Sequence, residues 1–177
     1  CDTSVVEPDK GLIIRGYPLL DITSMLPEEI FYLLLTGEKP SAEDTKMLQD
    51  DLAARSSVPD YVWDALRALP EDAHPMNMLS TAILIMGRES KFRKAYNEGM
   101  KKEDYWKPML EDSLDILGVL PCIAAMIYKI RYGKGLKRDK MRFDDMVVWD
   151  KSLSWGANFA NKLPVKDEDG SFAELIE

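Results

Sequence analysis

The amino-acid sequence predicts an all-α fold with a short β-hairpin near its N-terminal end. From residue 27 to residue 177, apolar side chains recur every three or four positions between prolines, glycines and capping residues, which is the spacing of amphipathic helices. The alternation typical of strands is confined to residues 3–18,. The connections between periodic segments are short, and the sequence has no internal repeat or low-complexity linker. These features are typical of packed helical domains.

The hairpin is predicted over residues 3–18. Two β-prone segments, 3–6 and 12–17, flank a segment with proline, aspartate and glycine at residues 7–11. These residue types are typical of turns, so the two segments are expected to pair across this connection.

Three short helices are predicted next, at residues 27–37, 41–56 and 59–70. Pro27 suits the first helical position, where the missing N–H has no cost, and Gly37 is a typical residue at a helix end. Ser41 is placed as the capping residue of the second helix, and Asp44 three residues later resembles the acidic partner of a capping box.

The most apolar helical segment runs from His74 to Gly87. His74 is placed at the capping position, Pro75 at the first helical position and Gly87 where a left-handed residue would end the helix,. The predicted apolar stripe contains Met76, Leu79, Ala82, Ile83 and Met86, with Leu84 and Ile85 extending it. We expect this helix to be buried on nearly all sides, by this chain or by a second copy. At about 12 residues, or roughly 18 Å, it is too short to cross a bilayer.

The longest predicted helix runs from about Pro108 to Tyr132, after a shorter one from Ser90 to Gly99. Pro121 interrupts the long helix and removes a hydrogen bond to the carbonyl of Leu117, so two segments are predicted to meet at an angle near residues 117–121. Further elements are expected at 146–161 (helix), 167–170 (turn) and 171–177 (a helical pattern of two turns).

The composition argues against several classes of partner and compartment. A chain of 177 residues with 46% hydrophobic residues is long enough for one core,. Its net charge of −8 argues against nucleic-acid binding,. Two cysteines, Cys1 and Cys122, cannot form a disulfide framework and indicate a reducing compartment,. No signal peptide, transit peptide or membrane-length apolar segment is visible. We expect a processed or partial chain, incomplete at both ends.

The residue types that catalysis requires are scarce. The sequence contains one histidine, His74, and a capping or buried hydrogen-bonding role is favoured over a catalytic one,. No cysteine pair, histidine pair or aspartate-rich loop has the spacing of metal ligands, so no metal is expected. Residues 133–135 read GKG but lack the rest of a phosphate-binding signature,.

A basic segment spans residues 129–142 and contains Asp139 as its one acidic residue. Its cationic residues are Lys129, Arg131, Lys134, Lys137, Arg138, Lys140 and Arg142. A solvated surface loop is the preferred interpretation, while a phosphate-bearing ligand, an anionic lipid or an acidic partner stay open as alternatives. The same interpretations stay open for the pair Lys101 and Lys102.

Several motifs, in unbroken order, resemble the citrate synthase family in its mitochondrial-type form. In chain order they are PDKG at 8–11 with IRGY at 14–17, LLLTGEKP at 33–40, HPM at 74–76 with Leu79, Phe92 with Ala95, Tyr96 and Gly99, YW at 105–106, ED at 111–112, LPCIAA at 120–125 with Ile127 and Tyr128, and Trp149 with Ser154, Asn158 and Phe159. The similarity covers nearly all 177 residues. Their joint order is more specific than any single motif.

The resemblance implies an all-α, obligately dimeric enzyme that condenses acetyl-CoA with oxaloacetate and water, giving citrate and free CoA in the tricarboxylic acid cycle. In that mechanism an aspartate removes a proton from the acetyl methyl group and one histidine stabilises the enol. Another histidine polarises the oxaloacetate carbonyl, and arginines hold its carboxylates. These groups lie in the later half of the family's sequence. No catalytic residue is therefore expected in this chain, which alone should be inactive, and His74 matches a non-catalytic position.

The resemblance assigns one binding residue, Lys102, which corresponds to a basic residue that holds the CoA phosphate across the dimer interface. That residue is usually an arginine. Acetyl-CoA is a substrate, and no cofactor is expected. The resemblance also implies a homodimer through helices near residues 75–86 and 108–132, located in the mitochondrial matrix.

Residues 1–177 are thus predicted to be a partial large helical domain of a citrate synthase, with a β-hairpin at 3–18 and helices over 27–177. An alternative is a non-catalytic, citrate-synthase-like structural subunit of a larger mitochondrial assembly. Such a subunit would dock through its apolar helices and the basic segment.

Overall fold

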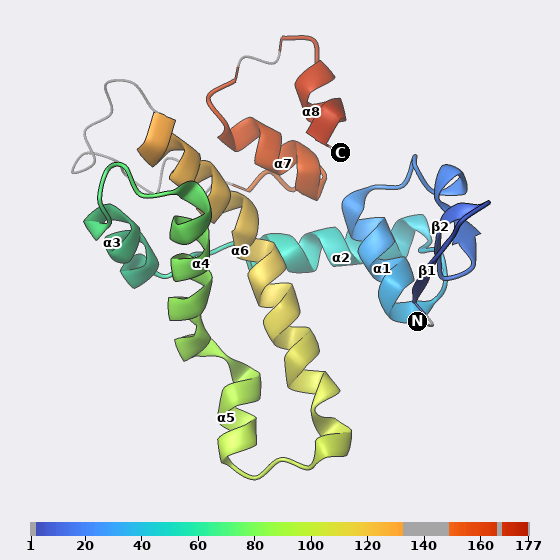
Figure 1. Cartoon of the computed structure of the whole chain (residues 1–177), viewed down its shortest axis with the longest axis horizontal. Coiled ribbons are helices and arrows are strands. Elements are labelled where there is room, and N and C mark those ends of the chain that lie inside the picture. The colour runs from blue at the N-terminus through green and yellow to red at the C-terminus, as the bar shows by residue number, and fades with distance from the viewer. Residues whose placement is uncertain (1–2, 133–148, 166–167, 177) are drawn as a thin grey trace.

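A computed structural model describes residues 3–132, 149–165 and 168–176 of the chain. It confirms a helical fold preceded by a small sheet (Figure 1). The helices are α1 (Pro27–Thr36), α2 (Ala42–Ala54), α3 (Asp60–Ala68), α4 (Pro75–Met86), α5 (Lys91–Asn97), α6 (Trp106–Tyr132), α7 (Trp155–Lys162) and α8 (Ser171–Ile176). Short 3-10 turns lie at Leu19–Asp21, Gly87–Glu89 and Lys102–Asp104. Helix α6 is central, and α4 and α5 run beside it (Figure 1).

The N-terminal sheet contains the predicted hairpin and one further strand. Strands β1 (Ser4–Glu7) and β2 (Gly11–Ile14) pair antiparallel, and β3 (Tyr17–Pro18) pairs with β2. The prediction treated residues 12–17 as one strand. However, Arg15 (φ 49°) and Gly16 (φ 88°) are both left-handed, as in a two-residue hairpin loop. Arg15 also donates from Nε and Nη2 to the carbonyl of Leu34, at 2.9 and 2.7 Å, which holds the sheet against α1.

Local sequence signals set the beginnings of several helices as predicted. Pro27 is the first residue of α1, and Gly37 (φ 84°) follows its end. Ser41 and Asp44 form a reciprocal capping box at α2: the Ser41 hydroxyl oxygen accepts from the Asp44 N–H, and the Asp44 carboxylate accepts from the Ser41 N–H,. At α4 the His74 Nδ1 accepts from the N–H of Met76 at 3.2 Å, which confirms the capping role.

The main core lies between α3, α4 and the C-terminal half of α6. It contains Val62, Trp63 and Leu66 from α3, Met78 and Ala82 from α4, and Ile123 and Met126 from α6. The predicted stripe on α4 is wrong in part, because Met76 is 59% exposed and the inward residue is Met78. The described residues of one chain do not bury this helix on nearly all sides, since Leu84 is 77% exposed. Burial by a second copy stays a prediction. Among the described residues, helix α4 packs mainly on α3 and α6, and its opposite face is exposed at Leu84.

Two predictions about backbone breaks are corrected. Gly87 has φ −54° and ψ −15°, so the chain passes from α4 into the 3-10 turn Gly87–Glu89 and does not end in a left-handed residue. Helix α6 is one element of 27 residues with Pro121 inside it, and not two segments. The Leu117 carbonyl, which cannot receive an N–H from Pro121, accepts a hydrogen bond from the indole of Trp155, a residue far away in the sequence,.

Residues 102–132 are long and apolar enough to cross a bilayer by length and composition, although no membrane-length apolar segment was predicted. Ile123 and Met126 in this helix are fully buried in the core. A central helix of a packed domain meets the same criterion, so the observation is weak evidence for a membrane span.

The predicted helix over 146–161 begins later than expected. Helix α7 starts at Trp155, capped by Ser154, whose hydroxyl oxygen accepts from the Ala157 N–H. The buried Asn158 side chain accepts from the N–H of Asp150 and donates to its carbonyl, which fixes a turn where the helix was expected. Residues 146–148 and residues 133–142 of the basic segment lie outside the described residues.

Candidate functional site

The sequence-predicted binding residue, Lys102, lies in the turn that connects α5 to α6. It is the first residue of the 3-10 turn Lys102–Asp104, and its side chain is exposed. The N–H of Tyr105 donates to its carbonyl at 3.3 Å, so the main chain closes on itself before α6 begins.

The end of α5 fixes the direction in which the turn leaves the helix. Gly99 is left-handed (φ 85°), and its N–H donates to the Tyr96 carbonyl at 3.0 Å. The N–H of Met100 donates to the Ala95 carbonyl at 3.1 Å. This pair of bonds is the Schellman arrangement, in which a glycine ends a helix with its last carbonyls satisfied. The turn therefore has a defined backbone geometry.

Three aromatic rings pack underneath the turn. Phe92 and Tyr105 meet edge to face with centroids 5.2 Å apart, and Tyr96 lies 5.9 Å from Phe92 and 5.8 Å from Tyr105. Rings from both sides of the turn thus contact each other. Aromatic pairs in such geometries stabilise beyond their buried area.

A carboxylate of α6 caps the N-terminus of α5. Asp112 accepts from the Ser90 hydroxyl at 2.6 Å and from the backbone N–H groups of Lys91 and Phe92 at 2.8 and 3.2 Å. These N–H groups have no partner within the helix. The cap on one side and the aromatic rings on the other hold α5, the turn and α6 as one unit.

Of the three lysines in and beside the turn, two lie close to carboxylates. The Lys101 ammonium lies 3.9 Å from Glu103, and the Lys107 ammonium lies 2.9 Å from Asp104. Lys102 has no ion-pair partner within the described ranges 3–132, 149–165 and 168–176. A surface hollow beside the turn is lined by Lys101 with Glu98, Glu103 and Asp104, but Lys102 is not among its lining residues.

A second polar cluster, which the sequence did not predict, joins α2 to α6. The Arg55 Nε lies 2.9 and 3.0 Å from the two carboxylate oxygens of Asp51. Its Nη1 donates to Glu111 at 3.0 Å and to Asp115 at 2.6 Å. Lys91 of α5 adds contacts of 3.1 and 2.8 Å to the same two carboxylates. The Arg55 side chain is 18% exposed, so this cluster is partly shielded from water.

This arrangement shifts the ionisation of its members. Hydrogen bonds from Arg55 and then Lys91 lower the pKa of Glu111,. Burial alone would raise the pKa of Asp115, but hydrogen bonds from Lys91 and Arg55 outweigh it and the shift is downward. The bond to Asp115 likewise raises the pKa of Lys91. Lys91, Glu111 and Asp115 are thus held in their charged forms, which indicates a structural clamp between helices.

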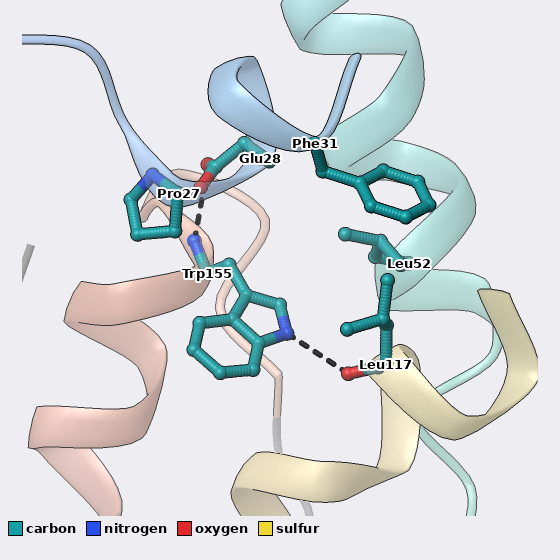
Figure 2. Close-up of a pocket in the computed structure, with 6 residues that line it drawn as sticks. All are labelled: Pro27, Glu28, Phe31, Leu52, Leu117 and Trp155. Atoms are coloured by element: carbon teal, nitrogen blue, oxygen red, sulfur yellow. Dashed lines mark hydrogen bonds between the residues drawn. The ribbon is translucent and has the colours of Figure 1, made fainter. Parts of the chain in front are cut away.

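A small cavity of about 70 Å³ lies where α1, α2, α6 and α7 meet, lined by Pro27, Glu28, Phe31, Leu52, Leu117 and Trp155 (Figure 2). Glu28 is 3% exposed, and its Oε1 accepts from the Gln49 side chain at 2.7 Å and from the Trp155 N–H at 3.2 Å. The walls are otherwise apolar.

A larger apolar groove of about 870 Å³ runs between α1, α2 and the N-terminal half of α6. Leu35, Met47, Trp106 and Met109 line it and are each at least half exposed. Among the described residues, no group of His, Cys, Asp and Glu is placed to hold a metal ion.

The fold and these sites define a class of protein. It is an all-α domain with an exposed lysine on the turn between α5 and α6 and with exposed apolar surfaces, and its described part contains no catalytic constellation. The chain matches the family model described as "Citrate synthase, C-terminal domain" over residues 1–177. The chain therefore belongs to the citrate synthase family.

Individual relatives agree with this assignment. Over 94% of the chain, it is 37% identical to "Citrate synthase 4, mitochondrial" of Arabidopsis thaliana, and over 98% it is 40% identical to "Citrate synthase, peroxisomal" of Saccharomyces cerevisiae. The chain covers 35% and 37% of these two relatives, about a third of their length. The crystal structure of citrate synthase from Pyrobaculum aerophilum has a TM-score of 0.78 at 22% identity over 99% of this chain and 43% of that one, which supports the fold.

Proposed function

We propose that this chain is part of an enzyme that condenses acetyl-CoA with oxaloacetate to give citrate and CoA in the tricarboxylic acid cycle. The observation that carries the proposal is the match of all 177 residues to the citrate synthase family model. The catalytic aspartate and histidines would come from sequence C-terminal to these residues. This chain would supply a large part of the helical domain and a basic contact to CoA.

The proposed contact is Lys102. An exposed ammonium without an ion-pair partner in the described part of the chain is suited to a phosphate, and the neighbouring lysines are already paired with carboxylates,. The enzyme would be a homodimer. Exposed apolar residues on α4 and α6, such as Leu84 and Tyr128, support association through these helices,. The mitochondrial relative favours the mitochondrial matrix, although the peroxisomal relative has the higher identity, 40% against 37%.

The activity is tested by thiol release from acetyl-CoA in the presence of oxaloacetate. We expect the full-length product of the gene to release free thiol, and the 177-residue chain alone to release none because the catalytic residues are absent. A full-length product without activity that still assembles with other proteins would favour the alternative, a non-catalytic structural subunit of a larger assembly.

The role of Lys102 is tested in the full-length enzyme by Lys102→Ala. Loss of one charge-assisted contact to phosphate should raise the KM for acetyl-CoA about tenfold and leave the KM for oxaloacetate unchanged. The matched control is Lys101→Ala, which removes the neighbouring ammonium and should change neither KM more than about twofold, because Lys101 is paired with Glu103,. Equal effects of the two variants would contradict the assignment.

A further inference from the structure

We propose that Pro121 and Trp155 form a lock that fixes helix α7 on helix α6. The proline leaves one carbonyl of α6 without its intrahelical donor, and the Trp155 indole fills that position. A helix without a proline at this position would offer no such acceptor. The contact therefore specifies where along α6 the first turn of α7 can dock.

The acceptor follows from helix geometry. In an α-helix the N–H of each residue donates to the carbonyl four positions earlier, and proline has no N–H. Pro121 therefore leaves the carbonyl of Leu117 free, in a part of α6 where Pro121 itself is buried. Trp155 Nε1 donates to this carbonyl at 2.9 Å (Figure 2). The two residues are 38 positions apart in the chain, so the contact is tertiary.

The same tryptophan is held at its backbone. Its N–H donates to Glu28 Oε1 of α1 at 3.2 Å, and the Gln49 side chain of α2 donates to the same oxygen at 2.7 Å (Figure 2). Trp155 is the first residue of α7. One residue thus connects the start of α7 with α1 at one end and with α6 at the other.

The surroundings explain why an indole suits this position. Pro27, Phe31 and Leu52 line the small cavity that the ring borders, so the apolar part of the side chain is accommodated. Tryptophan combines this large apolar surface with one donor, whereas phenylalanine would bury a ring and leave the carbonyl unpaired. A buried acceptor without a partner is costly.

The test is a double-mutant cycle in the intact chain, with unfolding measured by urea. Trp155→Phe should raise the equilibrium constant for unfolding about tenfold, or about 1.4 kcal/mol. In the Pro121→Ala background, residue 121 has its own N–H for the Leu117 carbonyl, so the same Trp155→Phe change should raise the constant less than about threefold. Equal effects of Trp155→Phe in both backgrounds would overturn the lock.

Hydrogen exchange of the indole proton gives a second measurement that does not depend on a foldable Trp155 variant. In the wild-type chain the Trp155 Nε1 proton should exchange at least about tenfold more slowly than that of Trp106, which is 61% exposed,. In Pro121→Ala it should exchange faster than in the wild type, because the N–H of residue 121 competes for the carbonyl. Unchanged protection of the indole proton in Pro121→Ala would contradict the proposal.

Discussion

Replacing Arg55 by methionine is expected to lower the free energy of unfolding by about 2–3 kcal/mol. Breaking a fully buried ion pair costs about 3–5 kcal/mol because charges are left without a partner. Here the three carboxylates that Arg55 contacts are 36–44% exposed, so water compensates in part,. Chemical denaturation at neutral pH measures the loss. The control is Lys46→Met in α2, whose exposed ammonium contacts Asp50 and the Lys151 carbonyl, and we expect a loss below about 1 kcal/mol,.

The loss in free energy of unfolding caused by Arg55→Met should also depend on pH. The pKa values of Glu111 and Asp115 are lowered in the folded chain from ordinary values of 4.5 and 3.8. A carboxylate whose pKa is lowered in the folded state stabilises the fold. This stabilisation is fully present at pH values above the ordinary pKa and is lost as the pH falls through the folded-state pKa. The difference between wild type and Arg55→Met should thus be constant near neutral pH and shrink below about pH 4. A difference that stays the same at acidic pH would assign the loss to packing of the arginine stem.

Gly118→Ala is expected to lower the free energy of unfolding by about 2–3 kcal/mol. A Cβ at residue 118 would lie 2.8 Å from the Arg55 Cβ, 3.0 Å from the Arg55 carbonyl carbon and 3.0 Å from the Leu52 carbonyl oxygen. Two of these atoms belong to the backbone of α2, so the end of that helix would have to move. Overpacking of this kind typically costs about 1–3 kcal/mol. Thermal and urea unfolding measure the loss.

Gly87→Ala is the matched control for this prediction. Gly87 has right-handed helical backbone angles, and a Cβ built there meets no described atom within 4 Å beyond Gly87 itself and its neighbours along the chain. Alanine should therefore stabilise the chain by about 0.4–1 kcal/mol, since it restricts the unfolded state without strain. A destabilisation by Gly87→Ala similar to that by Gly118→Ala would show that the close approach of α2 to α6 is not the cause.

The sequence predicted best those features that depend on neighbours in the chain. Pro27, Ser41 and His74 mark helix starts because capping chemistry acts over two or three residues. The backbone at Gly87 and the continuity of α6 at Pro121 were predicted wrongly. The environment of Pro121 includes Trp155, which follows 34 positions later and is brought close only by the fold. Local rules describe the missing bond of a proline but not the side chain that replaces it.

The candidate site likewise has one part that was predicted and one part that was missed. The role of Lys102 came from the resemblance of the chain to a family, whereas the residue pattern left several interpretations open for Lys101 and Lys102. The Arg55 cluster was missed because its partners Glu111 and Asp115 are 56 and 60 positions away. Charged residues at helical spacing are usually solvated, and only the crossing of α2 over α6 at Gly118 brings these groups together.

The cap that Asp112 provides to α5 has a consequence for local opening of the chain. Helix α5 has seven residues, too few for an isolated helix in water, and its first N–H groups are bound by a side chain of α6,. Helix α5 can therefore persist only while it is docked. Segments of this kind open and close cooperatively with the element that holds them, as one folding unit. The geometry of the turn that carries Lys102 is then maintained by the stability of α6, which contributes more buried residues than any other helix in the described part of the chain.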